Sequence, residues 1–493
     1  MKLFGSEENI RILNILREIP GKFAWLGLMI CVASAFAYGP WLLSMKSYLI
    51  MGFAIGSLLV MFIYSRFLKN IDLGRMESGW KTWSIIIFVG AGLRILWAVL
   101  VDPVYGGDAI SFHETALRIL SEHRYASTYQ DVLGIIDRQI ELRSWRPPGL
   151  PVMLACWYFI FGHESSSVIA FNIFVYVMTS LILIIFCVRL FNRGGVSVVL
   201  AVFALWPKLI ILGSVPLTEA PSLLLFLISV LAFDRFLRGS LPSSVGAGLA
   251  FGVGALVRPS MLLMPLAWGA MAAASTRVSL RRGALVLAGA TIIGMACVLP
   301  WSLRNQAVLG EFVLISTNGG DVLYRANNPR ATGNFTPAGE RDLTQFITNE
   351  AEWNKLGSAW AVEWILENPT EFLKSAIRKL GYFWGAGEDG NTFRLYYPDM
   401  KDRFPLIVLT AEILMNFSWF LLLFAVGGSL VAIRGEIITS PLLVGLMWGT
   451  LLLSGVHAVY ESHARYNLPI LGALILIAAS GPMLSRSGTS SAQ

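Results

Sequence analysis

Long apolar stretches recur along the whole chain and constrain its fold more than any other feature. Several of them, such as residues 82–101 and 166–189, contain almost no charged residue. A helix needs about 20 apolar residues to cross the roughly 30 Å hydrocarbon core of a bilayer. In lipid, a helix also satisfies its own backbone hydrogen bonds. The sequence therefore predicts an all-α polytopic membrane protein.

The apolar stretches predict about twelve transmembrane helices. The chain is 55% hydrophobic and 14% charged, whereas soluble domains carry about 25% charged residues. A cleaved signal peptide ending at Ala37 is disfavoured because its leader would be acidic. The predicted spans lie near residues 23–40, 47–67, 82–101, 166–189, 195–213, 218–236, 243–257, 260–275, 283–300, 405–433, 440–458 and 466–484.

Lysine and arginine in the short loops predict the orientation, because cytoplasmic loops are enriched in both. A cytoplasmic N-terminus places basic groups such as Arg66 to Lys81 and Arg277 to Arg282 inside, and leaves the short outer loops nearly free of positive charge. Both termini are then cytoplasmic, and two polar segments, 102–165 and 301–404, face outward. The net charge of +7 comes largely from loops that contact membrane lipids, so no nucleic-acid partner is predicted.

The two outer segments divide the chain into four predicted parts. Within 102–165, residues from Ala109 onward have helical periodicity typical of an interfacial helix. The apolar run Leu150–Phe161 is too short for a span and predicts an interfacial or re-entrant helix. Segment 301–404 predicts a small outer-face domain with helices near 340–380. The predicted parts are 1–81 (cytoplasmic N-terminus and two extra helices), 82–300 (transmembrane core with outer loop 102–165), 301–404, and 405–493 (C-terminal helices and a short cytoplasmic tail).

Asp108 is the first candidate for chemistry, in the sequence GGDAISFHETA directly after an apolar run. An aspartate after glycines and before a helix is a good N-cap, since its carboxylate accepts free backbone N–H groups. A carboxylate can also act as a general base when it reaches the proton that it removes. The two roles are compatible, and the local sequence does not choose between them.

Three arginines lie where apolar segments are predicted to meet the outer face. Arg146 precedes Pro147, Arg258 precedes Pro259, and Arg304 follows Trp301. Each could snorkel to the interface. Their convergence on one cavity would instead suit bidentate binding of a phosphate. A phosphate at a membrane surface indicates a lipid-phosphate substrate.

A second set of polar residues lies near predicted helix ends. Glu219 begins a predicted span. His457, Glu461, His463 and Arg465 follow the penultimate span. His457 and Glu461 could share a helix face and contribute to a metal site, but without a third ligand a hydrogen-bonded rim or substrate contact is favoured.

Taken in chain order, several motifs resemble those of a known family. The motifs are GGDAISFHETA, RPPGLP, LTEA, LVRPS, LPWSLRN, STNGGDVLYRANNPRATGNF and HARYNLP, across residues 82–470. They are similar to those of the membrane-integral GT-C glycosyltransferases, in the branch that contains protein O-mannosyltransferases and lipid A aminoarabinose transferases. The resemblance implies the GT-C fold in a bacterial inner membrane, with the active site on the periplasmic face.

The resemblance also implies an activity and partners. Such enzymes transfer a sugar, with inversion, from a polyprenyl-phosphate-sugar donor to a lipid, glycan or protein acceptor. Asp108 matches the catalytic aspartate, Arg146 and Arg304 match positions that hold the donor phosphate, and Arg258 matches a further basic position. The implied substrate-binding residues are His113, Glu114, Glu219, Asn318, Gly319, Asn328, Arg465 and Tyr466.

Two departures from the family pattern bear on this interpretation. Two predicted spans precede the usual first helix, and Asp108 is followed by Ala109 where the family commonly has a second acid. Without a second carboxylate at position 109, the inference that a divalent metal binds beside Asp108 is weaker. No cofactor is therefore predicted. A transporter or flippase of a lipid-linked or anionic substrate remains the alternative, although the chain shows no internal repeat. An acyl- or phosphotransferase with another lipid donor fits the arginines equally well.

Overall fold

The structure is a computed structural model that describes residues 7–38, 79–129, 140–191, 195–240, 242–334, 349–388, 390–433 and 440–484. Within these residues the fold is helical, apart from one antiparallel pair of short strands, β1 (Ser127–Tyr129) and β2 (Ile140–Leu142). The predicted all-α class is therefore confirmed for the described part of the chain.

Eight of the described helices are long and apolar enough to cross a membrane, or nine if one bent pair forms a single span. The chain is accordingly an integral membrane protein. The predicted span 47–67 lies outside the described residues, and the total of about twelve stays a prediction. The long helices are α1 (Glu7–Tyr38), α4 (Trp80–Leu100), α7 (Ser165–Phe191), α10 (Glu219–Leu237), α13 (Leu280–Leu309), α19 (Pro405–Ile433), α20 (Pro441–Val459) and η5 with α21 (Ala464–Ile470 and Leu471–Leu484).

Two predicted spans differ in shape from the expectation. The run 195–213 is a bent pair in which α8 (Val196–Ala204) and α9 with η2 (Pro207–Ile211 and Leu212–Ser214) meet at 54°. Pro207 explains the break, because proline has no N–H to continue the helix. The span predicted to end at Pro300 continues as α13 to Leu309. The apolar part of this segment ends near Pro300, and the prediction placed the helix end there. A helix can continue beyond the part that contacts lipid.

The helices form a bundle around α10, which packs against α7, α11 (Pro242–Val257) and α20. Phe226 and Leu227 of α10 are fully buried. In contrast, α4 exposes Ile85, Phe88 and Val99, as expected for a helix that faces lipid. Two shorter apolar elements, η3 (Pro259–Leu263) and α12 (Met264–Ala274), occupy the predicted span 260–275.

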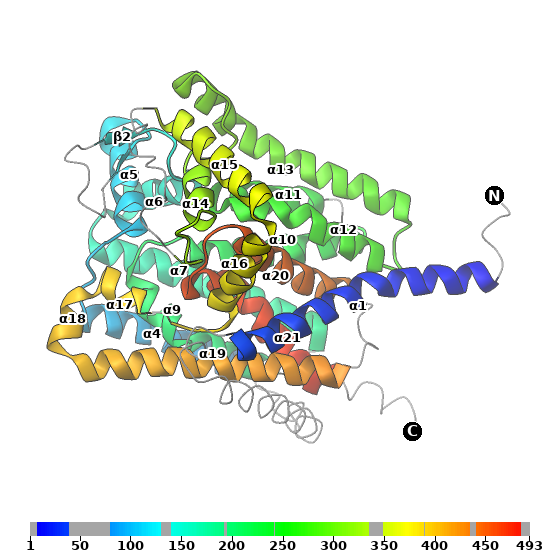
Figure 1. Cartoon of the computed structure of the whole chain (residues 1–493). Helices are drawn as coiled ribbons and strands as arrows, with labels where there is room; N and C mark the ends of the chain where they lie inside the picture. Colours follow the sequence, from blue (N-terminus) through cyan, green and yellow to red (C-terminus); the bar gives the residue numbers. More distant parts are fainter. Residues whose placement is uncertain are drawn as a thin grey trace.

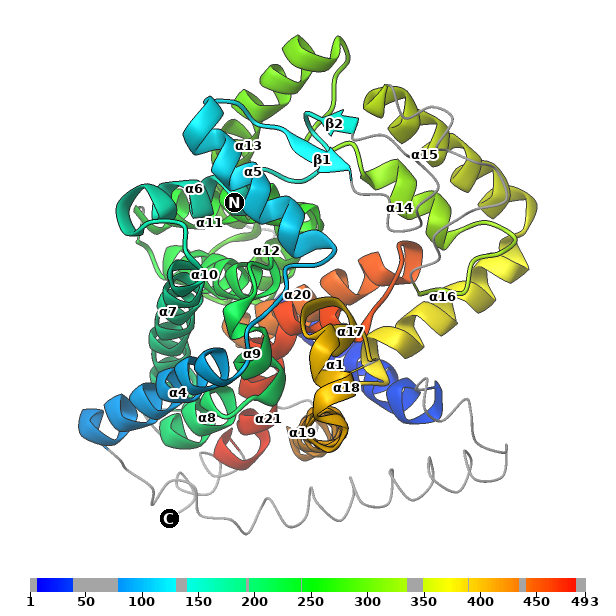
Figure 2. The ribbon, with the colours of Figure 1, turned by 90° about the vertical axis from the view of Figure 1, so that its left-hand side faces the viewer.

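The polar segments gather at one end of the bundle, at the left of Figure 1 and toward the viewer in Figure 2. The helix predicted after Ala109 is α5 (Asp108–Glu122), and the short apolar run forms α6 (Gly149–Phe161). Helices near 340–380 are also confirmed. The elements between α13 and α19 are α14 (Gly319–Ala326), α15 (Glu350–Glu367), α16 (Pro369–Trp384), α17 (Asn391–Tyr396) and α18 (Pro398–Arg403).

Candidate active site

A Gly-Gly turn places Asp108 at the start of α5. A Cβ atom on Gly106 would lie 2.3 Å from the backbone oxygen of Leu395, and Gly107 has φ +56° and ψ −122°, which other residues rarely adopt. The backbone N–H of Val104 donates to the carbonyl of Tyr396 at 2.9 Å. The turn thus lies against α17. Gly107 holds the N-cap position, so the capping interpretation of Asp108 is wrong.

The Asp108 carboxylate lies between two guanidinium groups instead. Its Oδ1 is 2.7 Å from Arg146 Nη2, and its Oδ2 is 2.6 Å from Arg465 Nη2. Arg146 precedes α6, and Arg465 is the second residue of η5. Burial alone would raise the pKa of Asp108, but the two guanidinium groups hold it well below its usual range. The carboxylate is therefore ionised at neutral pH.

Glu219 connects Arg465 to Arg258. Glu219 Oε1 lies 3.1 Å from Arg465 Nε and 3.5 Å from Arg258 Nη1. The ring of Tyr466 lies under both guanidinium groups, with its centroid 4.9 Å from Arg258 Cζ and 5.4 Å from Arg465 Cζ. Residues from five separate sequence motifs thus meet. They are called the arginine cluster below: Asp108, Arg146, Glu219, Arg258 and Arg465.

The arginine cluster is open on one side. The side chains of Asp108 and Arg146 are 28% and 21% exposed, whereas that of Glu219 is 4% exposed. A ligand that arrives from outside the protein therefore meets Asp108 and Arg146 first, and Glu219 serves as the buried base of the cluster.

A second charged network extends from the cluster to α14. Asp321 Oδ2 lies 2.9 Å from Arg325 Nε, and Arg325 Nη1 lies 3.3 Å from Glu461 Oε2. The hydroxyl of Tyr466 donates to Glu461 Oε1 at 3.4 Å. Burial raises the pKa of Asp321. Sequence reasoning missed Asp321 and Arg325, although their spacing of four residues is typical of an ion pair on a helix.

Arg304 lies outside the arginine cluster and holds the backbone that leads to Arg146. Its Nη1 donates to the Arg143 carbonyl at 2.6 Å and to the Ser144 hydroxyl at 2.8 Å, and its Nη2 donates to the Tyr125 carbonyl at 3.1 Å. Most N–H groups of the Arg304 guanidinium therefore already form hydrogen bonds within the protein. Its predicted contact with a donor phosphate is untested.

Glu350 holds the same stretch of backbone from the other side. Its Oε1 accepts hydrogen bonds from the N–H groups of Arg143 at 2.8 Å and Ser144 at 3.0 Å. The Tyr125 hydroxyl donates to the Arg146 carbonyl at 2.7 Å. The position of Arg146 therefore depends on buried polar contacts that its local sequence does not reveal.

His113 and Glu114 lie on α5 but not in the arginine cluster. His113 Nδ1 is 2.9 Å from the Tyr158 hydroxyl, and its ring makes edge contacts with Tyr105 and Tyr158. Burial lowers the pKa of His113. Glu114 is half-buried. The predicted substrate contacts of both residues remain predictions.

Asn318, Gly319 and Asn328 lie at the two ends of α14. Asn318 occupies the N-cap position and its Oδ1 accepts from the Ser316 hydroxyl at 2.9 Å, while Gly319 is the first helical residue. Asn328 Nδ2 donates to the Tyr324 carbonyl, and its Oδ1 accepts from the Arg330 N–H, both at 2.8 Å. These contacts shape the turns around α14. A role in substrate binding is untested.

His457 and Glu461 do not share a helix face, because α20 ends at Val459. His457 Nδ1 lies 2.9 Å from the backbone oxygen of Glu461. The shared-face interpretation is therefore wrong. In the part of the chain that the structure describes, no three His, Cys, Asp or Glu side chains are grouped so that they could hold a metal ion.

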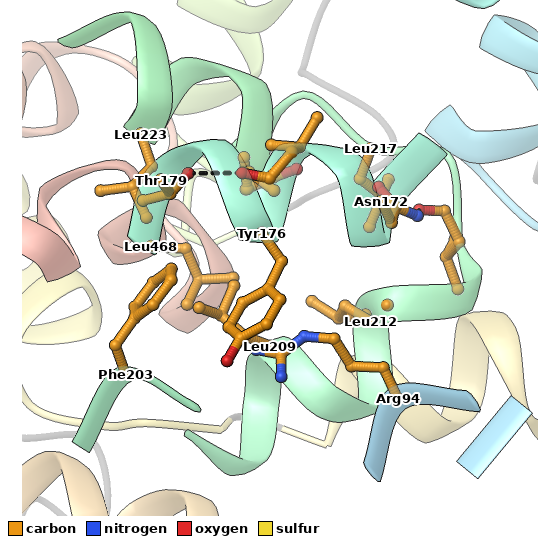
Figure 3. Close-up of a pocket in the computed structure, with 15 residues that line it drawn as sticks. Arg94, Asn172, Tyr176, Thr179, Phe203, Leu209, Leu212, Leu217, Leu223 and Leu468 are labelled. Atoms are coloured by element: carbon orange, nitrogen blue, oxygen red, sulfur yellow. Dashed lines mark hydrogen bonds between the residues drawn. The ribbon is translucent and has the colours of Figure 1, made fainter. Parts of the chain in front are cut away.

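Arg94 lines a cavity beside Tyr176 (Figure 3), and Glu219 also lines this cavity. Its Nη1 donates to the carbonyls of Gly90 at 2.7 Å and Ala204 at 3.1 Å, and its guanidinium lies 3.9 Å from the centroid of the Tyr176 ring. Sequence reasoning missed Arg94. Its sequence does contain a signal, because Arg94 is the single charged residue in the apolar stretch 82–101 and such residues often have a function.

No protein-family model matches the sequence, and no curated protein matches it either. Among solved structures, an apo oligosaccharyltransferase from Archaeoglobus fulgidus matches with a TM-score of 0.50 at 11% identity, over 82% of this chain and 50% of that one. The oligosaccharyltransferase AglB from the same organism, in complex with an inhibitory peptide and a dolichol-phosphate, gives 0.47 at 9% identity, over 81% and 49%.

The first of these matches shows a shared fold. The chain thus has the GT-C fold that its motifs predicted. It spans about half the length of the matched proteins. The narrower branch of O-mannosyltransferases and aminoarabinose transferases stays a prediction.

Proposed function

We propose that this protein is an inverting glycosyltransferase that moves a sugar from a polyprenyl-phosphate donor to an acceptor at the outer face of the membrane. The observation that carries the proposal is the Asp108 carboxylate, held between Arg146 and Arg465 at the open side of the arginine cluster. This arrangement combines cations for a phosphate with a carboxylate for an acceptor proton.

The donor phosphate binds at the open side of the cluster. Phosphate and guanidinium form strong, frequently bidentate hydrogen bonds. As the glycosidic bond breaks, negative charge develops on the departing phosphate, and nearby cations stabilise it most in the transition state. Arg146 and Arg258 are the proposed phosphate ligands. Arg304 contributes by holding the loop that carries Arg146.

Asp108 takes the proton of the acceptor as the acceptor attacks the sugar. Attack from the face opposite the departing phosphate inverts the configuration of the anomeric carbon. A general base must lie within hydrogen-bond reach of the proton that it removes. Asp108 meets this condition for an acceptor that enters beside Arg146, because it is the most exposed carboxylate of the cluster.

The fold supports transfer rather than transport. The A. fulgidus oligosaccharyltransferase that shares this fold is named for glycosyl transfer. In the described chain, the clustered charges lie at the end of the bundle that carries α5, α14 and α17 (Figure 2). The acceptor class, a lipid, glycan or protein, is left open in this proposal.

Reconstituted vesicles distinguish a transferase from a transporter. The purified protein is incubated with a polyprenyl-phosphate donor labelled on its sugar and with an extract of the cell envelope as acceptor source. A transferase moves label from the donor to a larger product without an ion gradient. Movement of unchanged labelled lipid across the vesicle, with no new product, would contradict the proposal.

A further inference from the structure

The two arginines that hold Asp108 are restrained to different degrees. Arg465 also pairs with Glu219 at 3.1 Å, donates to the Tyr396 hydroxyl and lies over the Tyr466 ring. Among the residues that the structure describes, the Arg146 side chain pairs with Asp108 and lies 5.8 Å from the centroid of the Phe112 ring. Arg465 is therefore fixed in place, and Arg146 is the partner that can be exchanged.

Arg146 also has a free hydrogen-bond donor. Its Nε is buried and has no hydrogen-bond partner among the described residues. A buried donor without a partner is unfavourable. The Nε–Nη2 edge of a guanidinium suits two oxygens of one phosphate, but in this structure Nη2 is occupied by Asp108. A phosphate that binds this edge must compete with Asp108.

We propose that the donor phosphate displaces Asp108 from Arg146, so that Asp108 becomes an effective base only after the donor is bound. This inference rests on the proposed function. Asp108 and the phosphate then share the arginine cluster: the phosphate takes Arg146, and Asp108 keeps its bond to Arg465. The donor consequently binds before the acceptor.

The electrostatics of the cluster support this exchange. Asp108 faces the cations Arg146 and Arg465, the ring of His463 and the hydroxyl of Tyr396, with Glu219 behind Arg465. The two arginines keep the pKa of Asp108 well below its usual range, which makes the free enzyme a weak base. Losing Arg146 and gaining an adjacent phosphate both raise that pKa. Donor binding thus strengthens the base.

Equilibrium binding tests the exchange without an acceptor. The probe is a geranyl methyl phosphodiester, which keeps one negative charge across neutral pH, and its binding to the purified full chain is measured by titration calorimetry. We expect Asp108→Asn to bind the probe about tenfold more tightly than the wild type, about 1.4 kcal/mol, because Arg146 is no longer engaged. Arg146→Met should weaken binding. In the Arg146→Met background, Asp108→Asn should give a much smaller gain, because only the repulsion between Asp108 and the phosphate is then removed.

A matched control removes one negative charge outside the arginine cluster. Glu371 on α16 is exposed and pairs with Lys374 at 2.7 Å, so Glu371→Gln should leave probe binding unchanged. Thermal unfolding of each variant verifies folding, and Asp108→Ser replaces Asp108→Asn if the latter does not fold.

Three results would overturn the inference. Unchanged or weaker binding by Asp108→Asn would show that Asp108 does not compete with the phosphate. A gain of undiminished size in Arg146→Met would show a general field effect without exchange at Arg146. Failure of the wild type and every variant to bind the probe would remove the proposed function itself, and the exchange with it.

Discussion

At the scale of residues, the arginine cluster contains both fixed and exchangeable charges. Glu219 is nearly buried and contacts two arginines. Removing one partner of a buried ion pair leaves an uncompensated charge and costs about 3–5 kcal/mol. Arg146 and Asp108 are more exposed, so water compensates part of any change there. Substitutions at Arg146 therefore report function more cleanly than substitutions at Glu219.

Arg146→Ala should raise the donor KM and lower the rate of transfer. The variant loses a charge-assisted hydrogen bond to phosphate, which contributes about 1.5–3 kcal/mol, so kcat/KM for the donor should fall roughly 10- to 100-fold. Initial rates over a range of donor concentrations measure both parameters. Unchanged dependence on donor concentration would remove Arg146 from the phosphate site.

Lys379 should make the stability of the protein depend on pH. It is fully buried, its Nζ donates to Asn327 Oδ1 at 2.8 Å and to the Val459 carbonyl at 2.9 Å, and burial lowers its pKa to about 7. The unfolded lysine has a pKa of about 10.4. Between these values the folded state binds fewer protons than the unfolded state, so stability rises with pH.

The unfolding temperature of the wild type should therefore increase from pH 7 to pH 9. Lys379→Met removes the titrating group and should flatten this increase. Circular dichroism melts at both pH values test the prediction. An equally steep pH dependence in Lys379→Met would assign the effect to other groups.

Sequence reasoning identified all five residues of the arginine cluster and missed the residues around it. Asp108, Arg146, Glu219, Arg258 and Arg465 stand out in sequence because each is a polar residue at the end of an apolar segment. The capping interpretation of Asp108 was wrong because its ion-pair partners lie 38 and 357 residues away. Long-range partners of this kind leave no local pattern. Tyr396 was missed for the same reason.

At the scale of elements, the loop between β2 and α6 connects the outer helices to the active site. Arg304 of α13 and Glu350 of α15 hold it through backbone contacts. The hydroxyl of Ser144 also donates to Asn305 Oδ1 at 2.7 Å. The position of Arg146 is thus set jointly by two helices, α13 and α15, that are distant from it in sequence.

Arg304→Lys should lower stability by about 1–3 kcal/mol because lysine cannot reproduce the planar fork that bonds to two carbonyls. It keeps the positive charge, so a direct phosphate ligand would tolerate it better than a structural residue would. Thermal unfolding and donor KM are measured together. A large increase in donor KM with unchanged stability would favour the direct phosphate contact that the sequence predicts.

The apolar pattern predicted the existence of the helices better than their shape. α4, α7 and α10 follow the predicted spans closely, because a lipid-facing or buried helix needs apolar residues throughout its length. The bend between α8 and α9 is stabilised by Arg94, which donates to the carbonyl of Ala204 at the break. Hydropathy alone does not report this bend, and Pro207 within the run 195–213 was the sequence signal for it.

At the scale of the whole molecule, α5 and α14, which carry Asp108 and the Asp321–Arg325 pair, lie toward one end of the helical bundle (Figure 1). The loop charges predict that this end faces outward. The sequence predicted the fold class because motif order and hydropathy are properties of the whole chain. The acceptor depends on the surface of the outer helices, for which sequence provides no comparable rule.

Cysteine labelling tests the orientation. Glu371 on α16 and Arg281 at the start of α13 are both exposed and lie on opposite sides of the predicted membrane. A membrane-impermeant maleimide should label Glu371→Cys in intact cells, and Arg281→Cys only after lysis. The unmodified chain accounts for labelling of its own cysteines. The reverse pattern would place the candidate site in the cytoplasm.

The central claim is that Asp108 carries glycosyl transfer, and the rate of transfer from a labelled polyprenyl-phosphate sugar tests it most directly. Wild type, Asp108→Asn and the control Glu371→Gln are compared at equal amounts of folded protein. We expect the wild type and Glu371→Gln to label the acceptor at similar rates, and Asp108→Asn to lose transfer by a factor of at least ~10². Near-normal transfer by Asp108→Asn would contradict the account.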